Sequence, residues 1–300
     1  MKHVVVAGGT GLVGRHLVAA LAGAGTRVTV LSRSPGAAGL PPGAQARSWE
    51  DLPGTLEGAD AVINLCGEGI AGGRWSAARK RLLLDSRIAP TERLVRALGP
   101  AGPRVLVNAS AVGFYGPLDN QPVTEDHAPG TGFLAGLCRQ WEAAAGEATA
   151  HGVRVVQLRL GVVLARDGGA LPRMALPVRL GLGTRLGHGR QGLSWIHLDD
   201  LVRLILEAAA NPAYQGPVNA VAPEPVSNEA FTRALARRLK RPLLPVPAAL
   251  TRLALQALLG EMGQAMLLEG AYVRPERAGQ LGFTWRFPRL ADALADLLDR

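Results

Sequence analysis

The apolar positions of the first 160 residues follow two alternating periodicities. Short valine-rich runs of strand length cover residues 2–7, 26–31, 61–65, 104–109 and 153–158. Between them, apolar residues recur at helical spacing over 12–24, 77–98 and 134–151. Strands that alternate with helices of this length indicate a parallel sheet with right-handed crossover connections.

After Leu160 the alternation becomes less regular. Residues 165–195 are rich in Gly, Pro and Arg, which is typical of a long functional loop or a small subdomain. Helical spacing returns at 199–210, 228–239, 247–259 and 290–298, and 217–220 has the pattern of a short strand. We therefore predict an α/β fold, a Rossmann-like doubly wound parallel sheet with a smaller C-terminal α/β cap.

Composition narrows the class of protein. Hydrophobic residues make up 48% and charged residues 19%, which is typical of a globular chain rather than a disordered one. No apolar run approaches the roughly 18 residues of a membrane helix, and the run Val4–Ala7 ends in glycines rather than in a signal-peptide cleavage site. The two cysteines, Cys66 and Cys138, form neither a disulfide framework nor a metal cluster. These features predict a cytoplasmic protein with no membrane partner and no metal site.

The positive charge is concentrated in the second half of the chain. The formal net charge is +9, of which residues 151–300 contribute +7 and residues 1–150 contribute +2. Between Asp167 and Asp199 there is no acid, while four arginines fall there: Arg173, Arg179, Arg185 and Arg190. Such a stretch either steers an anionic small-molecule ligand or is a solvated loop in an arginine-rich protein. Nucleic-acid binding is not favoured, because no block of consecutive basic residues is interleaved with aromatics.

A glycine-rich turn follows the first predicted strand. Gly8, Gly11 and Gly14 form G-x-x-G-x-x-G between that strand and an amphipathic helix. In dinucleotide-binding folds the first glycine permits the tight turn, the second lets the backbone approach a pyrophosphate, and the third lets the helix pack closely. The positive end of the helix then attracts the phosphates. In this context the motif predicts a dinucleotide site.

The second predicted strand ends in Ser32 and Arg33. NAD-specific sites usually have an acid at this position, which binds the ribose hydroxyls. A hydroxyl and a guanidinium instead suit a 2′-phosphate, because arginine binds phosphate through a charge-assisted fork. The pair therefore favours NADP(H), although Arg33 also fits a surface residue that opens a loop.

Three segments together resemble the extended short-chain dehydrogenases/reductases. They are the glycine loop, 108–116 with the sequence NASAVGFYG, and 195–200 with the sequence WIHLDD. The chain is similar along its whole length to the atypical branch called epimerase family proteins, including that branch's C-terminal domain of unknown function. The resemblance implies NADP(H) binding with no settled substrate. The word epimerase reflects fold analogy and says nothing certain about the chemistry.

The resemblance also extends the set of expected cofactor contacts. It adds the turn after the third strand, Arg87 on the long helix behind that turn, Ala109 in the next strand and Val163 after the strand at 153–158. The predicted cofactor-binding residues are Gly8, Thr10, Gly11, Leu12, Val13, Gly14, Ser32, Arg33, Leu65, Cys66, Gly67, Arg87, Ala109 and Val163.

The expected domain organisation follows from the same motifs. Residues 1–164 are predicted to form the NADP-binding Rossmann domain, whose sheet is completed by parts of 195–222. Residues 165–300 are predicted to form the substrate or cap region, with a C-terminal helical domain from about residue 247.

The usual catalytic pair of this superfamily is absent. Ordinary members carry Tyr-x-x-x-Lys on the helix after the fifth strand, which places both side chains on one helical face. Aligning Glu142 with the glutamate that commonly follows the pair puts Leu134 at the tyrosine and Cys138 at the lysine. Neither side chain supplies the proton or the cation.

Other polar residues near the predicted site have less certain roles. Ser110, at the end of its strand, is the catalytic candidate, since its hydroxyl is suited to polarise a carbonyl. An alignment on Tyr115 instead places Ala111 at the usual serine position. Tyr115 is more often structural in such a pair with glycine, and His197 is expected to cap the helix that follows it.

Three hypotheses remain. The first is an NADP(H)-dependent oxidoreductase or epimerase-like enzyme with a non-standard proton donor and an unknown small-molecule substrate. The second is a non-catalytic NADP(H)-binding regulatory protein. The third, the weakest, is a nucleic-acid-associated protein that uses the basic second half. The sequence does not indicate the oligomeric state.

Overall fold

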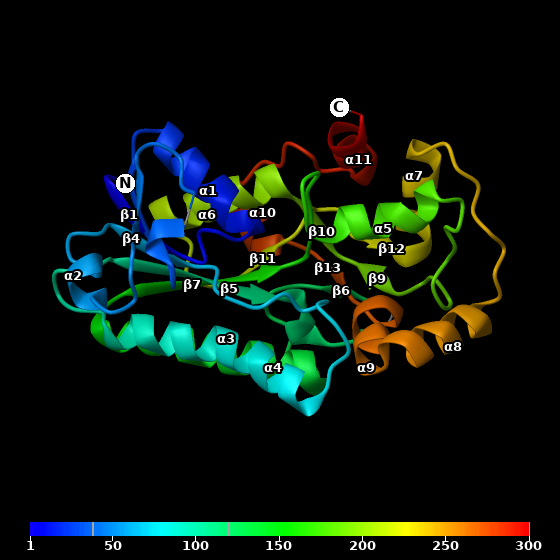
Figure 1. The fold of residues 1–300 in the computed structure, drawn as a ribbon, viewed down its shortest axis with the longest axis horizontal. Helices are drawn as coiled ribbons and strands as arrows, with labels where there is room; N and C mark the ends of the chain where they lie inside the picture. The colour runs from blue at the N-terminus through cyan, green and yellow to red at the C-terminus, as the bar shows by residue number, and fades with distance from the viewer. Residues whose placement is uncertain (38, 119–120, 300) are drawn as a thin grey trace.

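The centre of the protein is a seven-stranded sheet in which all neighbouring strands are parallel (Figure 1). The computed structural model describes residues 1–37, 39–118 and 121–299. Across the sheet the order is β11 (Gly216–Ala220), β7 (Arg154–Leu160), β5 (Val105–Ala111), β4 (Ala61–Asn64), β1 (His3–Ala7), β2 (Arg27–Leu31) and β3 (Ala44–Arg47). The chain winds outward from β1 in both directions. The β1/β4 boundary is therefore the crevice in which such sheets bind ligands.

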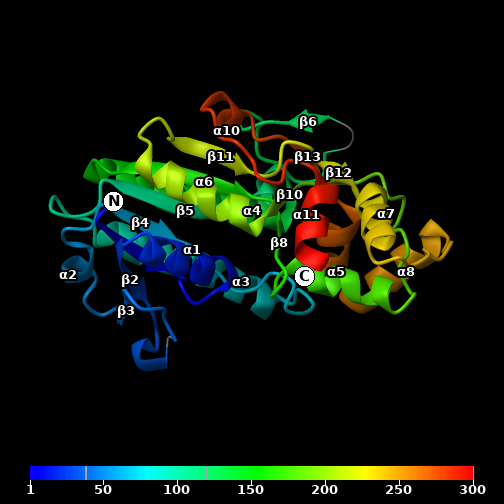
Figure 2. The ribbon, with the colours of Figure 1, turned by 90° about the horizontal axis from the view of Figure 1, so that it is seen from above.

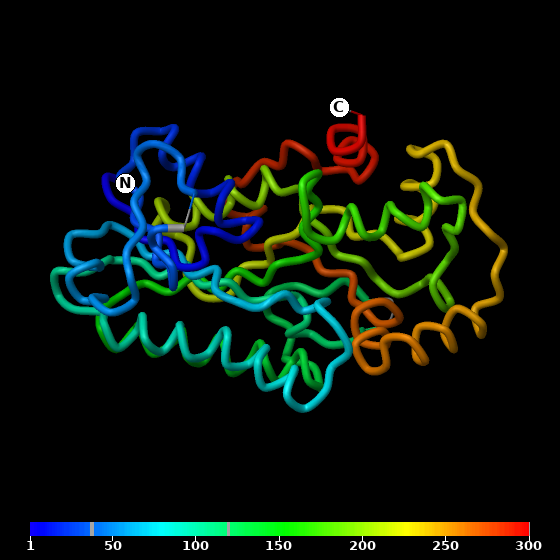
Figure 3. The backbone as a smooth tube through the Cα atoms, viewed as in Figure 1, coloured from blue at the N-terminus to red at the C-terminus, as the bar shows by residue number. Residues whose placement is uncertain are grey.

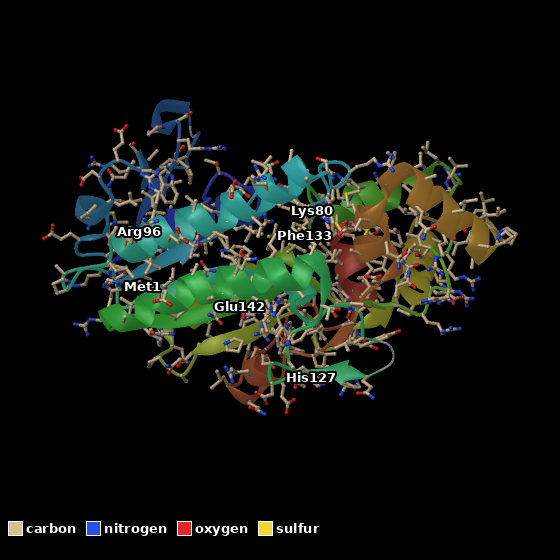
Figure 4. The ribbon with its side chains drawn as sticks, turned by 90° about the horizontal axis from the view of Figure 1, so that it is seen from below. Met1, Lys80, Arg96, His127, Phe133 and Glu142 are labelled. Atoms are coloured by element: carbon tan, nitrogen blue, oxygen red, sulfur yellow. The ribbon has the colours of Figure 1, made fainter. Side chains whose placement is uncertain are left out.

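Helices cover both faces of the sheet. Helices α1 (Leu12–Gly23) and α6 (Leu198–Ala210) lie on one face (Figure 2), and α2 (Leu52–Leu56), α3 (Ala77–Arg96) and α4 (Gly132–Gly146) lie on the other (Figure 4). Side chains of β1 alternate between the two: Val4 and Val6 pack with α1 and α6, whereas Val5 packs with α2 and α3. Burial on both faces explains why the strands are continuous apolar runs.

The cap lies beyond the carboxyl ends of the strands. Its helices are α5 (Ala170–Arg179), α7 (Asn228–Arg238), α8 (Ala248–Leu259), α9 (Glu261–Gly263) and α11 (Leu290–Leu298). Three small sheets join the layers, formed by β8 (Val162–Leu164) with β10 (Trp195–His197), β9 (Gly192–Leu193) with β12 (Val226–Ser227), and β6 (Pro122–Val123) with β13 (Tyr272–Val273). Single turns of 3₁₀ helix cover Pro35–Ala37, Val112–Tyr115 and Glu147–His151, and Gln264–Leu268 forms a π-helical turn.

The chain passes between the central sheet and the cap more than once (Figure 3). After the cap helices α8 and α9 it returns to the sheet as α10 (Glu276–Gln280), which packs against β11. Phe283 joins the core under α6, and the indole N–H of Trp285 donates to the Val221 carbonyl at 2.9 Å. The last helix, α11, lies in the cap again. The predicted fold class, a doubly wound parallel sheet with a smaller α/β cap, is confirmed.

Several short elements were not predicted along the chain, among them β3 and α5. The edge strand β3 was not expected, because its sequence Ala-Gln-Ala-Arg has no apolar run. The stretch 165–195, for which a long loop or a small subdomain was predicted, contains helix α5 with Pro177 inside it. Within the described part of the chain, no helix is both long and apolar enough to cross a membrane.

Candidate functional site

Backbone contacts leave no room for a side chain at two glycines of the loop between β1 and α1. Gly8 has a φ of +78°, and a Cβ on it would lie 2.7 Å from the carbonyl carbon of Leu65. A Cβ on Gly14 would lie 2.2 Å from the carbonyl oxygen of Gly8. Because both distances are far below van der Waals contact, glycine is required at both positions. The loop therefore folds tightly beside the turn that follows β4.

The first turn of α1 suits an anion. No side chain caps its N-terminal N–H groups, and the turn contains no acidic residue. The N-cap residue Gly11 and its neighbour Thr10 are exposed at the tip of the loop, while Leu12 and Val13 are half-buried behind them. Free backbone N–H groups at the positive end of a helix are a common phosphate site. This cradle fits the pyrophosphate of a dinucleotide.

The end of β2 lies next to this cradle. The Ser32 backbone N–H donates to Arg47 at 2.9 Å, and its hydroxyl accepts from the Ser34 N–H at 3.1 Å. Arg33 is exposed, and no ion pair holds it within the described ranges. Burial raises the pKa of the Cys66 thiol to about 12, although the nearby charge of Arg33 acts in the opposite direction. Cys66 is thus a packed neutral thiol, and Arg33 has a free guanidinium close to it.

Arg87 of α3 closes over the turn after β4. Its Nη1 donates to the Leu83 carbonyl and its Nη2 to the Glu68 carbonyl, both at 3.0 Å. The guanidinium carbon lies 5.3 Å from the centre of the Trp141 ring. A Cβ on Gly67 would come within 3.0 Å of that carbon, so the glycine makes room for the arginine. The cation is held at the floor of the turn rather than in bulk solvent.

The two positions of the missing catalytic pair are apolar, and one of them, Cys138, lies near Arg87. Leu134 of α4 packs against Gly113, and Cys138 is buried with its thiol 3.7 Å from the Ala111 carbonyl. Burial raises the pKa of Cys138 to about 11, while the charge of Arg87 acts to lower it. Arg87 packs on Trp141, one turn of α4 beyond Cys138, so a cation from α3 lies beside the helix position that aligns with the lysine of ordinary members.

A buried polar network lies beneath this region. The Glu142 carboxylate accepts from Arg159 Nε and Nη2, both at 2.9 Å, and from the Ser110 hydroxyl at 2.6 Å. Arg159 also donates to the Tyr115 hydroxyl at 2.9 Å, and its guanidinium carbon lies 3.5 Å from the centre of the Phe114 ring. Figure 4 shows that Glu142 belongs to α4, which runs beside α3. The arrangement links β5, β7 and α4 into one unit.

The network continues to the far edge of the sheet. The Tyr115 hydroxyl donates to Asn219 Oδ1 at 2.7 Å, and Glu125 accepts the backbone N–H groups of Asn219 and Arg277 at 2.9 and 3.3 Å. Burial raises the pKa of Tyr115 and of Glu125. Tyr115 is buried with its hydroxyl bonded on two sides, which agrees with the structural role expected for it. The sequence signal that was missed is Arg159 itself, because a charge inside a buried strand requires a partner.

The segment after β8 is fastened over the glycine loop. Arg15 Nη2 and His16 Nε2 of α1 lie 2.6 and 3.2 Å from Asp167 Oδ2. A Cβ on Gly169 would lie 2.8 Å from a methyl carbon of Leu12 and 3.4 Å from the Val163 carbonyl oxygen. These contacts bring the predicted contact residue Val163 to the glycine loop.

The four arginines of the acid-free stretch diverge. Arg173 donates to the Ala71 carbonyl at 3.3 Å and thus reaches the turn after β4. Arg185 instead pairs with Glu229 of α7 at 3.9 Å, and Arg179 and Arg190 are exposed. Only Arg173 contacts the edge of the crevice, so the four do not surround a single anion.

The predicted capping role of His197 is confirmed, and two tryptophans are packed in the interior. Trp141 and Trp195 are buried. His197 is the N-cap of α6, where its Nδ1 accepts from the Asp199 N–H at 3.1 Å, and its ring stacks on Phe287 at 3.9 Å between centroids.

Most of the predicted site residues meet around one crevice. The glycine loop, Arg33, the turn 65–67, Arg87 and Val163 are linked by the contacts above. Ala109 is buried within β5, and the Ser110 hydroxyl is bonded to Glu142, in the interior rather than at the crevice surface.

Comparisons with known proteins agree with this geometry. Residues 4–221 match the model of the NAD dependent epimerase/dehydratase family, and residues 246–297 match the domain of unknown function DUF1731. A relative from Mycobacterium bovis, epimerase family protein Mb2239, is 44% identical over 97% of this chain and 96% of its own. The crystal structure of human epimerase family protein SDR39U1 with NADPH superposes with a TM-score of 0.88 at 35% identity, covering 99% of both chains. A nucleoside-diphosphate sugar epimerase from Corynebacterium glutamicum has a TM-score of 0.79 at 32% identity, covering 99% of this chain and 58% of its own.

Proposed function

The chain belongs to the NAD dependent epimerase/dehydratase family, in the branch with a C-terminal DUF1731 domain; from this premise we propose that it is an NADP(H)-dependent oxidoreductase or epimerase-like enzyme. Its substrate is a small molecule, and its proton donor is not the usual tyrosine. The observation that carries the proposal is the crevice itself, in which a glycine-rich turn with uncapped helix N–H groups lies beside the exposed Arg33 at the end of β2.

The cofactor half of the proposal rests on complementary charge. The N–H groups at the start of α1, which no side chain caps, suit the pyrophosphate, and Ser32 and Arg33 suit a 2′-phosphate on the adenosine ribose. An acid at this position would repel that phosphate, and neither residue is acidic. The human relative at 35% identity, whose crystal structure contains NADPH, supports the same choice.

We assign to Arg87 the role of the missing lysine. In ordinary members the lysine holds the ribose next to the nicotinamide and supplies a positive charge. Arg87 brings a cation near position 138 from a different helix, and its guanidinium is fixed by two backbone carbonyls and the Trp141 ring. Arginine retains its charge in such a half-buried place because its ordinary pKa is so high, even though burial lowers the pKa of Arg87.

The chemistry follows from what the crevice can position. Bound NADP(H) supplies or accepts a hydride at a substrate carbon. The chain's own contribution is to orient the dinucleotide and to surround the reacting region with Leu134 and Cys138, which exclude water rather than donate protons. Ser110 stays the candidate for polarising a carbonyl, and to do so its hydroxyl must leave Glu142. Because no general acid is positioned, turnover of simple carbonyls should be about 10²- to 10⁴-fold slower than in family members that carry the Tyr-x-x-x-Lys pair.

Turnover measurements on a panel of substrates test the proposal. Loss of NADPH absorbance is followed with simple aldehydes, ketones and enones, and nucleotide sugars are incubated with oxidised cofactor and their isomers separated by chromatography, because epimerisation consumes no net cofactor. Wild-type protein is compared with Arg33→Asp as the matched cofactor-binding variant. The expected result is slow turnover by the wild-type protein and still slower turnover by Arg33→Asp. Binding of NADPH with no turnover on any class would instead favour the non-catalytic regulatory protein, which the apolar Leu134 and Cys138 positions also allow. Failure to bind NADPH would contradict both.

A further inference from the structure

One end of the cap exposes an unusual number of leucines. We call this surface, formed by residues 173–185 and 233–258, the cap end; it includes the end of α5, the connection between α7 and α8, and α8 itself (Figure 1). Among the described residues nine large hydrophobic side chains are markedly exposed, and seven of them lie here. They are Leu176, Leu180 and Leu182 near α5, and Leu244, Leu250, Leu253 and Leu258 on the connection and α8. Such a concentration on a folded protein marks an interaction site.

Helix α8 carries apolar residues on its outward side. Thr251 is buried on the inward side, where its hydroxyl accepts from the Gly187 N–H at 3.0 Å, and Leu255 is half-buried on the same side. At helical spacing the opposite side presents Leu250 and Leu253, which are 57% and 63% exposed, with alanines at 254 and 257. This outward side has no charged residue. Helix α8 is thus apolar on two sides, of which one packs against the rest of the cap and the other is exposed.

The leucines near α5 are joined to the connection before α8. The Leu244 N–H donates to the Gly183 carbonyl at 2.8 Å, and the Thr184 hydroxyl donates to the Leu244 carbonyl at 3.0 Å. Leu182 and Leu244 therefore lie on backbone segments that are bonded to each other. The exposed leucines of α5 and of the connection belong to one surface.

The charged residues of the two cap-end segments are all cations, although carboxylates of neighbouring elements pair with three of them. Neither of its two segments contains an Asp or a Glu. A depression of about 390 Å³ between α7 and the connection is lined by Arg233, Arg237, Lys240 and Arg241. Arg233 pairs with Glu229 at 2.6 Å, and Arg238 pairs with Asp299. In the part of the chain that the structure describes, six cations of the cap end have no carboxylate partner: Arg173, Arg179, Arg237, Lys240, Arg241 and Arg252.

We propose that the cap end docks on the surface of an anionic lipid bilayer, contrary to the expectation from the sequence that the protein has no membrane partner. Leucines that protrude next to arginines and lysines are the pattern of proteins that lie on a membrane, with apolar side chains among the acyl chains and cations at the headgroup phosphates. Figures 1 and 2 show that α7, the connection and α8 form the extremity of the molecule farthest from β1–β3. A bilayer can approach this extremity without touching the glycine loop.

The charge pattern favours a bilayer over two other occupants. In a symmetric dimer the same patch faces itself, so the unpaired cations of one copy would meet those of the other. Nucleic acid would use the cations but not the leucines, and neither segment of the cap end contains an aromatic residue that could stack on bases.

Vesicle co-sedimentation of the full chain tests the proposal. Vesicles of phosphatidylcholine alone are compared with vesicles that also contain phosphatidylglycerol, at low and high salt. We expect binding to the anionic vesicles only, weakened by salt. Leu250→Ser with Leu253→Ser, and separately Arg237→Glu with Arg241→Glu, should each weaken binding at least tenfold. The matched controls, Leu82→Ser on α3 and Arg104→Glu before β5, should bind like the wild type.

Three results would overturn the proposal. They are wild-type protein that stays in the supernatant with anionic vesicles, control variants that lose as much binding as the cap-end variants, and light scattering that shows a dimer which the leucine variants dissociate. The last result would assign the surface to a second copy of the chain. Because the substituted side chains are exposed, thermal unfolding and NADPH binding should be unchanged in all variants, which separates loss of docking from loss of folding.

Discussion

Replacing Glu142 by glutamine removes the negative charge that faces the buried Arg159 guanidinium. The two side chains are only 9% and 5% exposed, and two bonds of 2.9 Å join them. Breaking a buried pair by removing one partner costs about 3–5 kcal/mol, because the remaining charge has no compensation. Ser110→Ala, which removes one charge-assisted hydrogen bond of 2.6 Å, should cost about 1.5–3 kcal/mol.

Urea unfolding followed by circular dichroism measures both values. With a denaturant dependence of about 3 kcal/mol per molar urea, Glu142→Gln should lower the unfolding midpoint by about 1 M or more. The matched control is Glu92→Gln, because the Glu92–Arg96 pair of α3 spans 3.0 Å but is 49% and 71% exposed (Figure 4 labels Arg96). An exposed pair of this kind contributes about 0.3–0.5 kcal/mol, so the control should hardly shift.

The double variant Glu142→Leu with Arg159→Met completes the test. It removes both charges, so its loss of unfolding free energy should be smaller than the sum of the losses in Glu142→Leu alone and Arg159→Met alone. The reasoning is refuted if Glu142→Gln unfolds at the same urea concentration as Glu92→Gln, or if the double variant costs the full sum. Either result would mean that the two side chains are not a buried pair.

Three further outcomes follow from the same contacts. Arg87→Met should weaken NADPH binding about tenfold in calorimetry. Adding Cys138→Lys to this variant should restore part of the lost affinity. Cys138→Lys alone should destabilise the protein, because it buries a second cation beside Arg87. Burial lowers the pKa of His197 below 6.5, so the neutral ring's contribution to stability is complete above pH 6.5 and is lost as the pH falls below that value. His197→Asn, which keeps a cap acceptor, should flatten the dependence of the free energy of unfolding on pH. An unchanged pH dependence would contradict this. Gly14→Ala, whose Cβ would lie 2.2 Å from the first glycine's carbonyl oxygen, should abolish NADPH binding in the same titration, whereas Gly23→Ala, with open space around it, should leave binding intact.

The fold and the cofactor crevice were predictable because their signals are local. A valine-rich strand, a glycine at each position where a Cβ would meet backbone, and an amphipathic helix are adjacent in sequence, so one motif specifies the loop from Gly8 to Gly14. The end of β2 is equally local, since the residue after the strand necessarily reaches the same edge of the sheet.

The features that were missed depend on distant partners or on weak patterns. Glu142 and Arg159 lie on different elements, and no spacing rule brings a helix and a strand together. Helix α5 was hidden by its two prolines, Pro172 and Pro177, although the first turn of a helix and a bent helix tolerate this residue. The strand β3 forms because β2 offers it a backbone edge, not because its own residues are apolar.

Calorimetric titration of the wild-type protein with NADPH and with NADH tests most directly whether this crevice is an NADP(H) site. A charge-assisted contact between Arg33 and the 2′-phosphate predicts that NADPH binds tighter by about 1–3 kcal/mol, or roughly five- to 150-fold. Arg33→Asp should erase or invert this preference, because an acid at the end of β2 binds ribose hydroxyls and repels phosphate. Equal affinities of the wild-type protein for the two cofactors, or a preference that Arg33→Asp leaves unchanged, would contradict the assignment.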